Sequence, residues 1–382
     1  MFSVSAFPRL PVEIFERILK ALESDERSLS ACAQVTRRWR EVSSVFRFQT
    51  VSLYTRSQFE SFCEWSRMPS TQELARHIKV LKLIGEPRGF VLDCQLFASI
   101  FPNLPGLDEV YTQDICILPP SISQKDERIW PIVSLTQRIT RRLPLPFLSP
   151  TRILRALLTN VAPQTLVLDI PIYQEIFLPQ TVLPSWKISR LLLTERTNFQ
   201  TIASSGVLAP NTLEHVALSW SVWDHQSLDE LLHFTRTLGQ NVSSMDLQLD
   251  LSYLCLRCLR RFGEALALLQ SLRELRLQLR IPSQGIDPSH SALKDIYSEA
   301  PRTLTSFTVR FEGPDTAGDD SSSLQWLDLH ELDRPWFRER FPKLQSVTVE
   351  LESADLHTRS AVVMSLLPKL HQAQLLRIIE VQ

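Results

Sequence analysis

Glycine is scarce in this chain: only 9 of its 382 residues are glycine. Average proteins contain about 7% glycine, so the deficit argues against the glycine-rich loops that hold nucleotide phosphates and dinucleotides. The formal net charge is −1, unlike that of a strongly basic nucleic-acid binder or a polybasic membrane binder. No uncharged run reaches the length of a membrane span, so we expect neither nucleic acid nor membrane as a partner.

Cysteine is also infrequent, with six residues spread along the chain. This number is far below that of a secreted domain held together by disulfides. Charged residues interrupt the short apolar run at the N-terminus that a signal peptide would need. We therefore expect reduced, mostly buried thiols and a cytoplasmic or nuclear location.

Leucine, in contrast, is abundant, with 61 residues. A chain of this length is expected to form two or three domains, or one long repeat array. Many leucines combined with few glycines favour helices and stacked repeats over glycine-rich nucleotide folds. Internal periodicity is therefore the most informative feature of the sequence.

Residues 8–48 have the pattern of a small helical module. Pro11 suits the first position of a helix, and apolar residues then recur at four-residue spacing to about Leu22. We expect Ser28 to cap a second helix and a third helix to carry Trp39 on its apolar side. Three short helices bury too little surface to be stable alone. The module is therefore either a cap on a following repeat array or a docking surface for a partner.

This module resembles the F-box. The resemblance rests on L-P-x-E-I, then I-L-x-x-L, a short apolar helix and V-x-x-x-W. Ser28 stands where the family often has aspartate, which exchanges one capping residue for another. The matching residues are Leu10, Pro11, Glu13, Ile14, Ile18, Leu19, Leu22, Leu29, Val35 and Trp39.

F-box modules bind the Skp-type adaptor of an SCF-type (cullin-RING) ubiquitin ligase, while the rest of the chain selects the protein to be ubiquitinated. The resemblance implies the same partners here: a Skp-type adaptor, a cullin bound through it, and an unidentified protein substrate. It implies no catalytic residue, because other subunits carry out the chemistry. The adaptor-binding residues that it implies are Leu10, Pro11, Ile14, Ile18, Leu19, Leu29, Val35 and Trp39.

A second pattern, apolar-x-x-apolar-x-apolar, recurs after residue 77 with a period of roughly 30 residues. One copy is missing between residues 112 and 163, and Trp130/Val133/Leu135 is the candidate for it. The other copies are Ile78/Leu81/Leu83, Leu107/Val110/Thr112, Pro163/Leu166/Leu168, Ile188/Leu191/Leu193, Leu213/Val216/Leu218, Val242/Met245/Leu247, Leu272/Leu275/Leu277, Leu304/Phe307/Val309, Leu344/Val347/Val349 and Ala373/Leu376/Ile378.

Each copy predicts a strand, a loop and a helix that stops at a proline. Several strands follow an apolar residue and a proline, as in Ala300-Pro301 and Phe341-Pro342, and the residue before a proline is pushed out of the helical region. The expected helices include Ser227–Leu238, Arg260–Leu269 and His357–Leu366.

The repeats resemble leucine-rich repeats in their period and strand motif. The asparagine or cysteine expected eight residues after the first leucine is absent, so an asparagine ladder between loops is missing. The predicted fold class is α/β: a leucine-rich-repeat-like solenoid with parallel strands on its concave face, preceded by a three-helix F-box-like module. The predicted domains are residues 8–50 for the module, 51–77 for a helical connector and 78–382 for the solenoid.

Two segments interrupt the repeats. Residues 118–151 are rich in proline and predict an insertion that runs over the surface. Residues 313–323 predict an exposed acidic loop. That loop is a solvated tip, a phosphorylation site or a contact for a basic partner.

The repeats also predict a substrate-binding face. Side chains alternate between the two faces of a strand, so the residues between the buried leucines should lie on the opposite side. In leucine-rich repeats the open strand side chains line the concave surface, which implies substrate contacts there. The candidate residues are Glu274, Arg276, Gln278, Arg280, Thr348 and Glu350.

Catalytic and cofactor motifs are absent from the sequence. It contains no dinucleotide or phosphate loop, no serine-nucleophile motif and no zinc helix. Cys255 and Cys258 lack the second pair that a zinc site needs, and Asp224-His225 has no nucleophile motif beside it. We therefore expect no enzyme activity, no cofactor and no metal. The leading hypothesis is a substrate-recruiting ligase subunit; the alternative is a non-ligase scaffold or inhibitor that binds a partner through the solenoid.

Overall fold

The structure is a computed structural model with two compact units. The first comprises Met1–Leu148 with Arg152–Val161, and the second comprises Ser149–Thr151 with Ala162–Gln382. None of the helices in the described ranges has both the length and the apolar character needed to cross a membrane. The structure describes residues 11–22, 25–85, 89–118, 129–139, 154, 156–158, 161–169, 187–194, 208–209, 211–219, 225–250, 256–280, 292–312, 329–352 and 356–381.

Three short helices open the first unit: α1 (Val12–Ala21), α2 (Glu26–Val35) and α3 (Arg37–Arg47). The prediction that Ser28 caps α2 is wrong. Asp25 is the cap, because its carboxylate accepts the backbone N–H groups of Arg27 and Ser28, and the Ser28 hydroxyl adds a third bond at 2.6 Å. Thr36 caps α3 by accepting the N–H of Trp39 at 3.2 Å. Both caps satisfy N–H groups that lack partners within a helix.

A strand that the sequence analysis missed follows α3. Strand β1 (Thr50–Leu53) lies at the start of the predicted connector and pairs in parallel with β2 (Val80–Ile84). A strand of four residues is too short to show the repeat pattern. The sheet therefore begins at β1, before the predicted start at residue 78. The rest of the connector is helical: α4 (Arg56–Arg67), the 3-10 turn η1 (Pro69–Thr71) and α5 (Gln72–Ala75).

The strands β1, β2, β4 (Glu109–Gln113) and β6 (Trp130–Arg138) lie side by side in this order, with parallel neighbours. A separate parallel pair, β3 (Phe90–Asp93) and β5 (Ile115–Leu118), extends the same unit. The helix α6 (Cys94–Ala98) and the turn η2 (Phe101–Asn103) complete the described elements of this unit before β4.

Strand β6 is the missing repeat, but in a different register from the prediction. Leu135 pairs with Val110 of β4 and is buried together with Ile132 and Gln137, whereas Val133 is 48% exposed. The repeat is therefore Ile132/Leu135/Gln137, and the polar Gln137 concealed it. The prediction of a surface insertion over residues 118–151 is wrong for β6; residues 119–128 and 140–150 lie outside the described residues.

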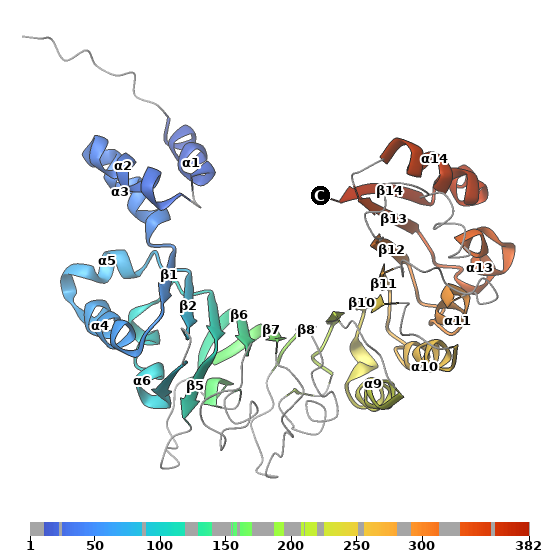
Figure 1. The fold of residues 1–382 in the computed structure, drawn as a ribbon, viewed down its shortest axis with the longest axis horizontal. Coiled ribbons are helices and arrows are strands. Elements are labelled where there is room, and N and C mark those ends of the chain that lie inside the picture. Colours follow the sequence, from blue (N-terminus) through green and yellow to red (C-terminus); the bar gives the residue numbers. More distant parts are fainter. Residues whose placement is uncertain are drawn as a thin grey trace, which may run out of the picture. The chain divides into compact units, whose positions relative to one another are not determined.

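The second unit contains eight parallel strands in chain order (Figure 1). The predicted repeats are in register: Met245 pairs with Leu275, Leu275 with Phe307, and Phe307 with Val347. Every pair from β7 to β14 is parallel, as a repeat array with helical crossovers requires. The strands are β7 (Val161–Asp169), β8 (Arg190–Thr194), β9 (His215–Ser219), β10 (Ser244–Asp250), β11 (Glu274–Arg280), β12 (Ser306–Glu312), β13 (Ser346–Glu352) and β14 (Leu376–Val381).

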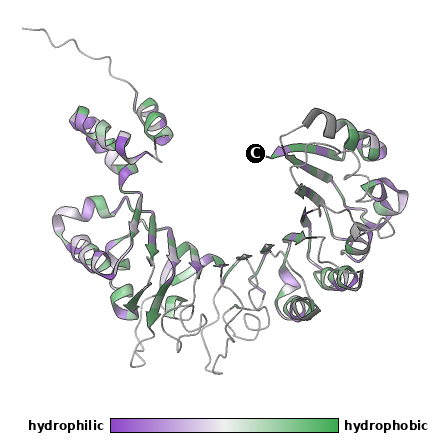
Figure 2. Cartoon of the chain, in the orientation of Figure 1, coloured by the Kyte–Doolittle hydropathy of each residue, from purple (hydrophilic) through white to green (hydrophobic). Residues whose placement is uncertain are grey.

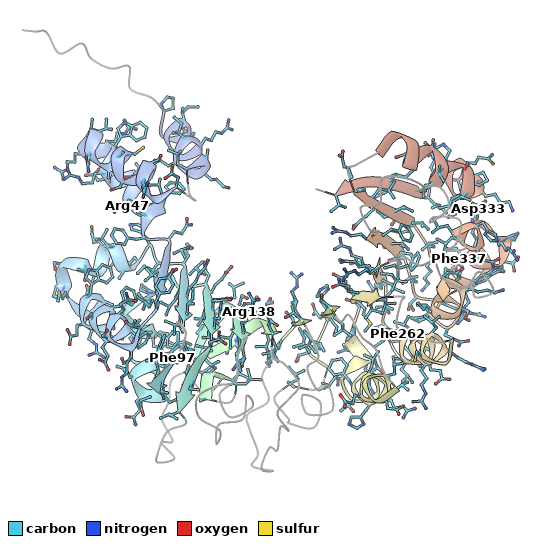
Figure 3. The ribbon with its side chains drawn as sticks, viewed as in Figure 1. Arg47, Phe97, Arg138, Phe262, Asp333 and Phe337 are labelled. Atoms are coloured by element: carbon cyan, nitrogen blue, oxygen red, sulfur yellow. The ribbon has the colours of Figure 1, made fainter. Side chains whose placement is uncertain are left out.

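Helices cover one face of β10 to β14 in the second unit (Figure 1). Phe262 and Phe337 project from two of these helices and are fully buried (Figure 3). The proline stops occur as predicted, since helices end just before Ala300-Pro301 and Phe341-Pro342. The helices are α9 (His225–Leu238), α10 (Leu256–Ala267), α11 (Ala292–Ser298), α13 (Pro335–Arg340), α14 (Leu356–Leu366) and α15 (Pro368–Gln372), with 3-10 turns η3 (Gly239–Asn241) and η5 (Leu329–Asp333).

Serine and threonine hydroxyls form hydrogen bonds between successive repeats, in place of the asparagine ladder that the sequence lacks. The Thr305 hydroxyl donates to the carbonyl of Arg273 at 3.0 Å, and the Thr305 N–H donates to the same carbonyl at 2.7 Å. Ser189 and Ser243 make the same pair of bonds from the equivalent position, directly before β8 and β10. Each hydroxyl satisfies backbone oxygen at a turn, so the repeats are tied without a conserved spacing motif.

Candidate functional site

Helix α1 exposes apolar side chains on one side of the helical module. Ile14 is 39% exposed and Ile18 is 38% exposed, and residues four apart lie on the same side of a helix. Val35, at the end of α2, is 62% exposed. Figure 2 shows apolar and polar residues along the same three helices. These side chains remain available for an apolar contact with a partner.

The other residues implied by the F-box resemblance have mixed positions. Pro11 is exposed and Trp39 is half-buried, while Leu10 lies outside the described residues. Leu19 and Leu29 are buried, with exposed fractions of 0% and 1%. In this structure both lie in the core of the module, and their contact with an adaptor stays a prediction.

Aromatic side chains fix the helical module to the first repeats. Phe48, just after α3, stacks on Trp65 of α4 with ring centroids 6.2 Å apart. Trp65 also stacks on Phe62 at 5.4 Å. Only Gln49 separates Phe48 from β1, and its carbonyl accepts the N–H groups of Lys79 and Val80. The module is therefore joined to the sheet by packing and hydrogen bonds, without a free linker.

The outward face of the second unit carries aligned rows of polar side chains. One row consists of Asp246, Arg276 and Thr308 from β10 to β12, which pair across neighbouring strands, and Ala217 of β9 continues it. The inward rows, in contrast, consist of buried apolar residues such as Leu277. Strand pairing thus sets polar groups from distant parts of the sequence next to one another.

The predicted substrate residues lie on this face with different exposures. Glu274 and Arg280 are exposed, and Arg276, Gln278 and Glu350 are half-buried. Arg276 Nη2 donates to Glu350 Oε2 at 2.6 Å, which links β11 to β13 across β12. Only 7% of Thr348 is exposed, so it offers less surface than the others, and its contact with a substrate stays a prediction.

A second charged pair on this face was not predicted. His215 Nε2 lies 3.9 Å from Asp246 Oδ2, and His215 Nδ1 lies 3.1 Å from the Ser244 hydroxyl. Burial lowers the pKa of His215, and the Asp246 carboxylate opposes this change. Burial raises the pKa of Asp246, while His215, Arg276 and Arg190 oppose the rise. The residues come from separate repeats, so no local motif could have revealed the pair.

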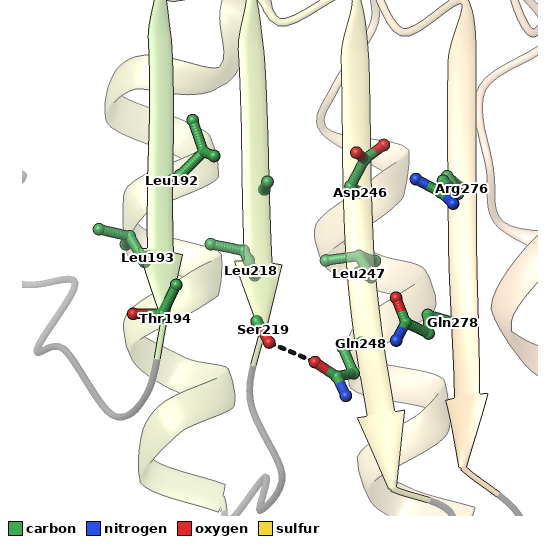
Figure 4. A pocket seen from close by; sticks show the side chains of 11 residues that line it. Leu192, Leu193, Thr194, Leu218, Ser219, Asp246, Leu247, Gln248, Arg276 and Gln278 are labelled. Atoms are coloured by element: carbon green, nitrogen blue, oxygen red, sulfur yellow. Dashed lines mark hydrogen bonds between the residues drawn. The ribbon is translucent and has the colours of Figure 1, made fainter. Parts of the chain in front are cut away.

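A pocket opens beside this pair (Figure 4). Leu192 of β8 and Ala217 of β9 provide apolar surface, and Asp246 stands on the next strand. Gln248 lines the pocket too, and the Ser219 hydroxyl donates to its side-chain oxygen. Arg276 and Gln278 of β11 complete the polar side. The pocket therefore combines an apolar wall with a carboxylate.

The described residues offer no grouping suited to metal binding. Cys258 is buried; Cys255 and Asp224 lie outside the described residues. Burial raises the pKa of Cys63, and raises that of Cys116 to about 11. Thiols with such pKa values stay protonated at neutral pH and are weak nucleophiles.

Comparison with known families identifies the helical module. Residues 7–49 match the family described as F-box-like. The resemblance seen in the sequence is thus confirmed: residues 7–49 form an F-box-like domain. The chain combines this domain with a parallel, leucine-rich-repeat-like array of strands and helices.

Solved structures with some similarity give low scores. The crystal structure of a TLR13–ssRNA13 complex is 11% identical with a TM-score of 0.38, and the match covers 80% of this chain and 39% of that chain. This chain thus spans about two fifths of the TLR13 chain. The crystal structure of the Rad7–Elc1 complex in yeast is 13% identical with a TM-score of 0.33, covering 88% of this chain and 87% of that chain. No curated protein matches the chain.

Proposed function

We propose that this protein is a substrate-recruiting subunit of an SCF-type ubiquitin ligase. The F-box-like domain docks a Skp-type adaptor and, through it, a cullin, while the outward strand face of the repeats binds a target protein. The family match at residues 7–49 carries this proposal. The role is non-catalytic, and the protein acts in the cytoplasm, the nucleus or both.

The exposed apolar side of α1 supports the docking role. The exposed parts of Ile14 and Ile18 lose contact with water only if a partner covers them, and this gains a fraction of the about 1.5–3 kcal/mol for complete burial of such a side chain. The packing of Phe48 on Trp65 joins the adaptor-docking module to the first repeats without a free linker.

The adaptor-binding role is tested with the full chain and a purified Skp-type adaptor. Ile14→Asp places a carboxylate in the apolar contact, which costs about 2 kcal/mol or more when the charge is buried. Lys20→Asp is the matched control, because Lys20 is an exposed residue on another side of α1. We expect pull-down of the adaptor to fail with Ile14→Asp and to persist with Lys20→Asp.

Equal adaptor capture by both variants would contradict docking through α1. A wild-type chain that never captures an adaptor, yet binds a protein through its repeats, would instead support the alternative role of a non-ligase scaffold or inhibitor.

A further inference from the structure

The pocket on β8 to β11 exists because two small side chains lie between larger ones. Ala217 pairs with Leu192 on one side and with Asp246 on the other. Ser219 lies between Thr194 and Gln248 one row further on. Because neighbouring strands are about 4.8 Å apart, the larger side chains of β8 and β10 are separated by twice that spacing. They therefore leave a space above the small side chains of β9. The strand register therefore produces a hollow beside Asp246 (Figure 4).

Asp246 is an acceptor without a donor. In the portion of the chain that the structure describes, no group donates a hydrogen bond to its carboxylate, and His215 Nε2 lies 3.9 Å from Asp246 Oδ2. Its side chain is about one third exposed, so a group entering the hollow can reach it. A partly desolvated carboxylate gains most from a charged donor.

The cation that lines the pocket is shared between two carboxylates. Arg276 lies beside Asp246 on the next strand and opposes the rise of its pKa, and the same guanidinium contacts Glu350 at 2.6 Å. Arg190 and Glu274 lie in the same row as His215 and have opposite charges. Three carboxylates thus face two arginines on this part of the strand face, and burial lowers the pKa of His215.

We propose that this pocket binds a lysine or arginine side chain of the recruited protein. The cationic head pairs with Asp246, and the aliphatic stem lies against Leu192 and Ala217, as long basic side chains do on apolar surfaces. The inference deepens the proposed function and relies on it for the statement that the partner is a protein. It moves the recognition site toward β9 from the β11 and β13 residues predicted from the sequence.

A library of random linear peptides, displayed on phage and selected on the purified full chain, tests the pocket. We expect one position of the selected peptides to be lysine or arginine. A fluorescent consensus peptide should bind about tenfold or more weakly when that residue is replaced by an uncharged analogue such as norleucine. Asp246→Asn should cause the same loss, and the two changes together should cost no more than either alone.

Two further variants sharpen the result. Ala217→Leu fills the hollow from β9 and leaves the Asp246 carboxylate in the sequence, and should weaken peptide binding to a similar degree. Asp229→Asn is the matched control, because Asp229 lies on α9 and pairs with Arg261, away from the strand face. Its peptide affinity should equal that of the wild type.

Selection of acidic peptides, of peptides without a common basic position, or of no peptide at all would overturn the proposal. A basic peptide whose affinity is unchanged by both Asp246→Asn and Ala217→Leu would overturn it as well. Adaptor capture measured on the same samples separates the two hypotheses. Retained adaptor binding with failed peptide selection rejects the pocket alone, whereas loss of adaptor binding by the wild type rejects the ligase role.

Discussion

The F-box-like domain and the second-unit repeats differ in the kind of side chain that they leave exposed. The domain has a thin core, with Leu19 and Leu29 inside and Ile14 and Ile18 left partly in water. The repeats bury a continuous inward row and turn polar side chains outward. The first arrangement offers apolar area, which gives affinity; the second offers placed charges, which give selectivity. A recruiting protein needs one surface of each kind.

The repeat core gives the largest expected effect. Leu277 is fully buried and pairs with Leu247 and Val309 on the neighbouring strands. Leu277→Ala should lower the free energy of unfolding by about 2–5 kcal/mol, because it removes apolar contacts and leaves a cavity. Urea denaturation measures the loss. Gln278→Ala, the adjacent residue on the outward face, should cost far less; similar losses would mean that the two faces do not differ as described.

The next largest effect is expected at the contact between the helical module and the first repeats. Trp65 makes two stacked contacts, with Phe48 and with Phe62. Each aromatic contact is worth about 0.5–1.5 kcal/mol, so Trp65→Ala should destabilise the first unit by about 1–3 kcal/mol. Thermal unfolding provides the measurement. Trp65→Phe should recover most of the stability, and an unchanged Trp65→Ala protein would show that the module is not held by this packing.

The strand array was the most predictable part of the molecule. Apolar triplets marked Met245, Leu275, Phe307 and Val347, and the structure pairs them in that register. Each strand of the array must bury apolar side chains at the same positions, so the apolar pattern recurs in the sequence. One repeat has the polar Gln137 in the inward row, so the apolar pattern was interrupted there and the predicted triplet was displaced by two residues.

Features that depend on pairing between repeats were not predictable. His215 and Asp246 lie next to each other only because β9 and β10 pair in one particular register. The hollow beside them depends on Ala217, an unremarkable residue in the sequence. The aligned hydroxyls, such as that of Thr305, have the same origin. A local sequence pattern indicates which side chains of one strand are buried. It carries little information about which residues of two different strands become neighbours.

The capping residue of α3 tests how marginal the F-box-like domain is. Thr36 accepts the N–H of Trp39, and loss of such a cap costs about 1 kcal/mol. Thr36→Ala should therefore lower the thermal midpoint of the first unit. Thr36→Asp keeps an acceptor at the same place and adds a charge that suits a helix N-terminus. Its midpoint should match or exceed that of the wild type; equal losses in both variants would assign Thr36 another role.

The smallest expected effect separates recognition from stability on the strand face. The pKa of Asp246 is raised by burial above its ordinary value of 3.8. A carboxylate of this kind is destabilising where it is ionised, above its folded-state pKa, and the penalty disappears once it is protonated in both states. Asp246→Asn should thus leave the thermal midpoint at pH 7 unchanged or slightly higher.

This advantage of the asparagine variant should shrink as the pH falls toward 4. Two changes act in the same direction: the wild-type carboxylate becomes protonated, and His215 acquires a charge that the carboxylates of Asp246 and Glu274 stabilise. Thermal unfolding at several pH values, compared with Asp229→Asn, measures the trend. A variant that is clearly less stable than the wild type at pH 7 would show that Asp246 is retained for the fold. A variant as stable as the wild type would show that the fold does not require the Asp246 carboxylate, as expected of a residue that acts in recognition.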